Sequence, residues 1–149
     1  MCLLKIRIFT AMSLAFCIAS AHAADIQIKM LDKSSTEGTL AFEPGFVKAS
    51  VNDTLVFIPA SNGHNSRSLL VPTGAEPWQS AFDKEFRVTL DKEGVYLYSC
   101  DSHKKMGMVG VVQVGNAVNL EEAKKIVAEE SARMVMNKDR FVKELEQVQ

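Results

Sequence analysis

The side chains best suited to metal and redox chemistry gather in one short stretch of the 149-residue sequence. Cys100 is followed by His103, and methionines stand six and eight positions after the cysteine, at Met106 and Met108. His64 is the only other histidine after position 22. Two imidazoles and a thiolate in a plane, with a weak axial thioether, form the type 1 copper site. This donor set therefore predicts one bound copper ion, cycling between Cu(I) and Cu(II), and single-electron transfer.

The first 23 residues are predicted to be a secretory signal peptide. Lys5 and Arg7 precede a mostly apolar run over residues 8–19, and Ala21-His22-Ala23 offers the small residues that precede a cleavage site. We expect cleavage after Ala23 and secretion of the remaining chain. The apolar run is too short to span a bilayer, so membrane insertion is not expected.

Removal of this leader changes the cysteine count and the charge. Cys2 and Cys17 lie inside it, so Cys100 remains alone. A lone cysteine in an oxidising compartment forms no intramolecular disulfide, which favours a metal-binding role. The loss of two of the 17 basic residues leaves 15 against 18 acidic ones, a net charge of −3. A nucleic-acid partner is not expected, because such proteins usually present a strongly basic face.

The elements that must position these donors are predicted to be short strands separated by turns. Such a pattern favours an all-β fold, an antiparallel Greek-key β-sandwich in which loops at one end meet in space. His64 follows one strand and Cys100 ends another, so the two can converge. Residues 62–82 are expected to be mostly loop, with one helical turn at residues 76–79. The predicted strands are residues 26–30, 46–49, 54–58, 86–90, 95–98 and 109–114.

Two helices are predicted to complete the single copper-binding domain of residues 24–149, within its last segment, 119–149. Asn119 can cap the first helix, and Glu122 stands where a capping-box carboxylate belongs. The second helix is expected to begin at about Lys138. Both are expected to cover one end of the sandwich. Their apolar, inward-facing residues are Leu120, Ala123, Ile126 and Val127 in the first, and Phe141, Val142, Leu145 and Val148 in the second.

Four longer stretches of sequence add to the evidence from the single donor residues. They are residues 42–49 (FEPGFVKA), residues 53–59 (DTLVFIP), Gly63-His64-Asn65 and residues 100–108 (CDSHKKMGM). With them the chain resembles the cupredoxins, the type 1 blue copper family, and within that family the pseudoazurin subfamily. The resemblance extends over residues 24–149 and implies a cupredoxin sandwich with two C-terminal helices.

The resemblance also implies which residues bind the copper ion. The methionine spacing alone leaves Met106 open, since amicyanins use a methionine six residues after the cysteine. The overall similarity to pseudoazurin favours the methionine eight residues after it. Asn65 is implied as a supporting residue, whose backbone amide donates toward the cysteine sulfur and whose side chain ties the two ligand loops together. The implied ligands are His64, Cys100, His103 and Met108.

A soluble, monomeric periplasmic electron carrier is the function that the resemblance implies. Its partners would be c-type cytochromes and copper- or haem-containing reductases, such as copper nitrite reductase, docking briefly around an exposed His103. The chain departs from the family pattern around the site: Ser102 replaces a frequent proline, Asp101 adds a negative charge, and Asn62 and Ser99 replace lysines. Lys33, Lys104 and Lys105 partly restore a positive field, so these departures bear on partner identity.

Two other functions use the same residues. A Cys–His hydrolase is conceivable, because a thiolate beside an imidazole can act as a nucleophile. It is disfavoured because the sequence offers no evident acid to orient the histidine. A copper carrier or store is the closer rival, but such proteins display several exposed ligands rather than one mixed site. Zinc accepts the same nitrogen and sulfur donors, so zinc in a preparation would say little about function.

Overall fold

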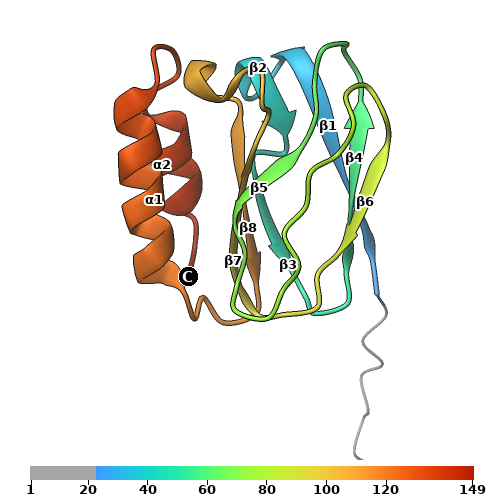
Figure 1. Ribbon diagram of the computed structural model, residues 1–149, viewed down its shortest axis with the longest axis vertical. Coiled ribbons are helices and arrows are strands. Elements are labelled where there is room, and N and C mark those ends of the chain that lie inside the picture. The colour runs from blue at the N-terminus through green and yellow to red at the C-terminus, as the bar shows by residue number, and fades with distance from the viewer. Residues whose placement is uncertain (1–22) are drawn as a thin grey trace, which may run out of the picture.

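The computed structural model describes residues 23–149, which form two packed sheets with a pair of helices beside them (Figure 1). The signal-peptide prediction concerns residues that lie outside this range, apart from Ala23. It stays a prediction. Within the described range no helix is both long and apolar enough to cross a membrane.

Eight strands in residues 23–149 build the two four-stranded sheets, and the predicted all-β Greek-key sandwich with two C-terminal helices is confirmed. One sheet has the order β2-β1-β4-β6 and the other β3-β8-β7-β5. The expectation of a wholly antiparallel sandwich is wrong, because β1 pairs with β4 and β3 with β8 in parallel. The strands are β1 (Asp25–Ser34), β2 (Gly38–Glu43), β3 (Phe46–Ala49), β4 (Thr54–Pro59), β5 (Arg67–Leu70), β6 (Phe86–Thr89), β7 (Gly94–Ser99) and β8 (Val109–Val114).

Strands β7 and β8 form the centre of the molecule and are buried at every position. Successive side chains of a strand point to opposite faces. Tyr96 and Tyr98 therefore join the core between the sheets, while Val95 and Leu97 join a second core on the other face. The Tyr98 ring lies so close to β8 that a Cβ on Gly110 would fall 2.3 Å from its hydroxyl.

The helices supply the second core. α1 (Leu120–Arg133) and α2 (Arg140–Leu145) pack on the outer face of the sheet that contains β7 and β8. They do not cover one end of the sandwich as expected, because Val95, Leu97, Val109 and Val111 form a hydrophobic sheet face that needs burial. Ala123, Val127 and Phe141 are buried there, as predicted. Val142 was predicted to face inward, but it is 39% exposed.

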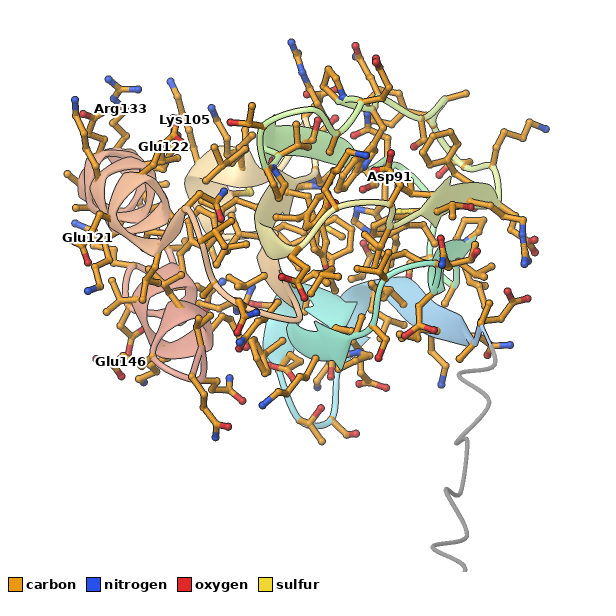
Figure 2. The ribbon with its side chains drawn as sticks, turned by 90° about the horizontal axis from the view of Figure 1, so that it is seen from below. Asp91, Lys105, Glu121, Glu122, Arg133 and Glu146 are labelled. Atoms are coloured by element: carbon orange, nitrogen blue, oxygen red, sulfur yellow. The ribbon has the colours of Figure 1, made fainter. Side chains whose placement is uncertain are left out.

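Charged residues lie on the outside of the helical layer: Glu121, Glu122 and Arg133 are all exposed, and Figure 2 shows Glu121 on the side of α1 away from the sheets. The predicted capping box is wrong, since no side chain caps the start of α1. Asn119 instead bonds to β7, accepting from the Val95 amide at 2.7 Å and donating to the Val95 carbonyl at 3.0 Å. Its amide thus ties the helix start to the sheet.

Two strands were missed in the sequence. β2 was not predicted, and β5 lies inside the 62–82 stretch that was expected to be loop. The predicted helical turn at 76–79 is also wrong, because Gln79 forms an isolated bridge with Arg67. The four-residue β5 is stabilised by its partner β7 rather than by a pattern of its own.

Candidate metal centre

His64 lies in the loop after β4 and is fully buried. Its loop is held from outside by one carboxylate. Asp83 Oδ1 accepts hydrogen bonds from the backbone amides of Gly63 at 2.6 Å and His64 at 3.2 Å. Two amides on one charged acceptor make strong bonds. They fix the backbone from which the imidazole projects.

The connection between β7 and β8, residues 100–108, carries the other candidate ligands; we call it the ligand loop. It closes on itself through backbone hydrogen bonds around a short 3₁₀ turn, η1 (Lys104–Met106). The amide of Cys100 donates to the Met108 carbonyl at 3.1 Å, and the amides of His103 and Met108 donate to the Cys100 and His103 carbonyls at 3.2 Å each. Cysteine, histidine and methionine are therefore held by one compact unit.

The two loops bring three donor atoms together. Nδ1 of His64 and Nδ1 of His103 lie 3.2 Å apart, and the Cys100 sulfur lies 3.9 Å from the first and 3.6 Å from the second. A point equidistant from all three lies about 2.1 Å from each, within the range of metal–nitrogen and metal–sulfur bond lengths. The donor set and its spacing therefore fit a trigonal metal ion.

The burial of the four predicted ligands is uneven. His64, Cys100 and Met108 are fully buried, and His103 is partly exposed. Burial, and then the nearby His64, lower the pKa of His103, which favours the neutral imidazole that a metal requires. His103 is thus the predicted ligand that reaches the surface.

Burial also separates the two candidate methionines. Met108 belongs to the same core cluster as Cys100, between the sheets. Met106 ends the 3₁₀ turn and is 36% exposed. Burial in the same cluster as Cys100 favours Met108 over Met106 as the sulfur ligand.

One residue that contacts a proposed ligand was not predicted from the sequence. Asp32, at the exposed end of β1, places Oδ1 3.0 Å from Nε2 of His64. A carboxylate on the far nitrogen of a metal-binding histidine fixes the ring and its tautomer. No local pattern singles out Asp32, because β1 and the His64 loop are brought together only by the pairing of β1 with β4.

The Asp32 contact overturns an argument from the sequence, since His64 does have an orienting acid. Asp32, His64 and Cys100 lie in a row like that of a Cys–His hydrolase. Both the sulfur-bearing residue and the imidazole are fully buried, however. A nucleophile must reach its substrate, so burial rather than the lack of an acid disfavours hydrolysis.

Asn65 ties the two loops together, as the resemblance implied. Its Oδ1 accepts from the Asp101 amide at 2.9 Å, and its Nδ2 donates to the Asp101 carboxylate at 2.8 Å. Gln79 also donates to that carboxylate, at 3.1 Å, and Arg67 lies 3.5 Å from it. The Asp101 charge is therefore partly balanced. The bond expected from the Asn65 backbone to the sulfur stays a prediction.

The lysines of the ligand loop have different surroundings. Lys104 pairs with Glu130 of α1 at 3.1 Å, so its charge is partly neutralised. Lys105 is exposed, on the outside of the molecule (Figure 2).

Comparison with known proteins agrees with this geometry. Residues 29–115 match the model of "Copper binding proteins, plastocyanin/azurin family". A putative pseudoazurin of Rhizobium leguminosarum bv. viciae is 42% identical over 109 residues, covering 71% of this chain and 71% of its own. The pseudoazurin of Paracoccus pantotrophus is 36% identical over 122 residues, covering 80% and 83%.

A solved structure extends the match to the helices. The crystal structure of native pseudoazurin from Hyphomicrobium denitrificans superposes with a TM-score of 0.74 at 34% identity, covering 84% of this chain and 98% of its own. Copper is the metal of the matching family, and its type 1 donor set is the one assembled here. The chain therefore belongs to the plastocyanin/azurin family of copper-binding proteins, with pseudoazurins among its relatives.

Proposed function

We propose that the protein is a periplasmic, pseudoazurin-like electron carrier and not an enzyme, with copper bound by His64, Cys100, His103 and Met108. The observation that carries the proposal is the buried triangle of two imidazole nitrogens and one sulfur, with edges of 3.2, 3.6 and 3.9 Å. Bound copper would supply the one-electron chemistry. A triangle already spaced for a metal needs little rearrangement when the charge changes.

The proposed ligands have different roles in electron transfer. Cys100 and His64 hold the buried side of the site, out of reach of substrates and free water. His103, partly exposed, provides the route by which an electron leaves or enters. Burial of three of the four proposed ligands favours electron transfer over the rival copper-carrier function, because rapid exchange of the ion requires accessible ligands.

The partners are proposed from the same surface. Copper- or haem-containing reductases such as copper nitrite reductase, and c-type cytochromes, would dock briefly around His103, and the carrier would act as a monomer. The interfaces of such redox complexes are small, and the complexes are transient. Export to the periplasm would use residues 1–23 as the cleaved signal peptide.

The decisive experiment is a visible spectrum of mature protein loaded with Cu(II), before and after ascorbate. We expect an intense thiolate-to-copper band that bleaches on reduction and returns on reoxidation. Cys100→Ser, which keeps the size but removes the thiolate, is the matched control and should show only the faint colour of ordinary Cu(II). Equal colour in both proteins would exclude Cys100 as a ligand. Copper that exchanges within seconds while electrons exchange slowly would instead support the rival function, that of a copper carrier.

The lysines permit a test of docking. Electrostatic steering acts mainly on the encounter rate, and salt screens it. We expect raised ionic strength to slow reduction by an acidic partner, and Lys105→Gln to slow it more than Lys104→Gln, because Lys104 is paired with Glu130. Stopped-flow rates at several salt concentrations would measure this. A salt-independent rate would rule out steering.

A further inference from the structure

The α1–α2 connection, which comprises residues 134–139 and the first residue of α2, Arg140, lies against the ligand loop although about 30 residues separate them in the chain. The two segments lie at the same end of the molecule (Figure 1). The connection donates to three successive backbone carbonyls just before Met108. The bonds run from Val135 N to Lys105 O at 2.8 Å, from Asn137 Nδ2 to Met106 O at 2.8 Å, and from Arg140 Nη1 to Gly107 O at 2.6 Å.

Arg140 makes this contact rigid. Its side chain is buried, only 8% exposed, and donates to three more carbonyls, on the β1–β2 turn and the start of β2. Burial lowers the pKa of Arg140, but a guanidinium keeps its charge, and charge-assisted bonds are strong. One cation thus joins helix, sheet and ligand loop. The three carbonyls are those of Glu37 at 2.6 Å, Thr39 at 3.0 Å and Leu40 at 2.7 Å.

The contact is also close enough to exclude side chains. Gly107 has a φ of 77°, and a Cβ on it would lie 2.7 Å from Cβ of Asn137 and 3.0 Å from its carbonyl oxygen. Glycine is therefore required both for the left-handed backbone and for the approach of the connection. Met108 is the next residue, so its backbone has little freedom to move.

We propose that the α1–α2 connection is a positioning clamp for the axial methionine, with Asn137 and Arg140 as its positioning residues. The proposal rests on the copper site proposed above. The axial sulfur bond of a type 1 site is long and weak, and it tunes the reduction potential. Because so weak a bond cannot hold the loop in place, the protein has to fix the distance, and the clamp does so from the side of the helices.

Asn137→Gly is the first test. Asn137 has a φ of 46°, so glycine fits its backbone while removing the side-chain bonds to the carbonyls of Met106 at 2.8 Å and Thr39 at 3.3 Å. The matched control is Asn52→Gly, at a φ of 77° in the turn before β4, where the hydrogen bond to Leu90 is made by the backbone amide. Both variants introduce the same flexibility, but only Asn137→Gly weakens the clamp.

The first measurement needs no copper. In metal-free protein we expect the amides of Gly107 and Met108 to exchange with solvent about fivefold faster in Asn137→Gly, the effect of losing one hydrogen bond to the ligand loop, and at the wild-type rate in Asn52→Gly. In copper-loaded protein, the relative intensities of the visible bands and the rhombicity of the Cu(II) EPR signal should shift in Asn137→Gly alone. Arg140→Lys keeps the positive charge but loses the several N–H donors of the guanidinium group. It should shift the band intensities and the rhombicity further.

Two results would overturn the clamp: wild-type exchange of the loop amides in Asn137→Gly, or faster exchange with an unchanged copper spectrum. The second result would mean that the connection holds the loop without setting the sulfur position. Failure of the copper site itself is separable, because a wild-type protein that binds copper without colour would contradict the proposed function before any variant is compared.

Discussion

The two sheets of the sandwich have different neighbours. The β3-β8-β7-β5 sheet is covered on one face by the other sheet and on the opposite face by α1 and α2. The β2-β1-β4-β6 sheet packs on one face only, and its edge strand β6 alternates half-buried and exposed residues. The two strands that are buried at every position, β7 and β8, therefore lie in the covered sheet, whereas the edge strand β6 of the open sheet alternates.

The proposed ligands are divided between these sheets, and their loops are held in different ways. Cys100, His103 and Met108 lie between the two fully buried strands, in a loop closed by backbone hydrogen bonds and by the clamp. His64 follows β4 of the open sheet, and side chains hold it: Asp83 at the backbone and Asp32 at the ring. The covered sheet thus positions three of the proposed ligands, and the open sheet contributes the fourth, His64.

The largest expected effect removes the cover of the buried sheet. Phe141 of α2 is fully buried in the core between helices and sheet. We expect Phe141→Ala to lower the free energy of unfolding by about 3–5 kcal/mol. Val142→Ala, at the exposed neighbour, should change it by less than about 0.5 kcal/mol. Denaturant unfolding of the mature protein measures both changes in free energy. A change for Phe141→Ala as small as that for Val142→Ala would mean that the helices add little to the stability of the sheet.

The next effect tests the side-chain support of His64. Asp83 has a φ of 58°, so Asp83→Gly removes the carboxylate without straining the backbone. Loss of supporting contacts typically weakens metal binding 10- to 100-fold. We expect copper binding about tenfold weaker, with Asp83→Asn, which keeps an acceptor, close to wild type. Chelator competition measures the affinity. Faster amide exchange in residues 100–108 as well would show that the two loops are not held independently.

A pH effect is expected in the helical layer. Burial, and then the charge of Glu37, raise the pKa of Glu144 to about 7. A carboxyl whose pKa is higher in the folded than in the unfolded state stabilises the protein at low pH, and this stability is lost as pH rises through about 7.

Glu144→Gln should remove that dependence. Between pH 5 and pH 8 we expect wild type to lose about 1–3 kcal/mol of unfolding free energy relative to the variant. Glu146→Gln, at a carboxylate that points outward (Figure 2), is the control and should follow wild type. If the unfolding free energies of wild type and Glu144→Gln changed with pH in parallel, Glu144 would not take up a proton on folding.

The smallest effect concerns the His64 ring. Asp32 is exposed, so solvent screens its charge. We expect Asp32→Asn, which keeps an acceptor but removes a negative charge that favours Cu(II), to shift the electron-exchange equilibrium toward Cu(I) by about threefold to tenfold. Redox titration against a reference couple measures the shift. Asp91→Asn, in the turn at the opposite end of β7 from Cys100, should leave it unchanged.

Features that depend on a local pattern of residues could be predicted from the sequence. The ligand loop and His64 are identified by residue type and spacing, and β4, β7 and β8 by their apolar runs. Features that depend on a contact between distant segments could not be predicted. β5 depends on its pairing with β7, Asn119 bonds to β7 instead of capping α1, and the helices cover a sheet face.

The order of the amino acids alone specifies the donor chemistry, because the donor atoms of cysteine, histidine and methionine are fixed by covalent structure and their spacing places three of these residues in one loop. It also determined the sandwich, because the periodicity of apolar residues follows the backbone geometry of strands. The folded protein was needed to show that Asp32 contacts His64, that Met108 and not Met106 is buried, and that residues 134–140 donate hydrogen bonds to the ligand loop. These are contacts between segments far apart in the chain, and packing of the whole fold brings them together.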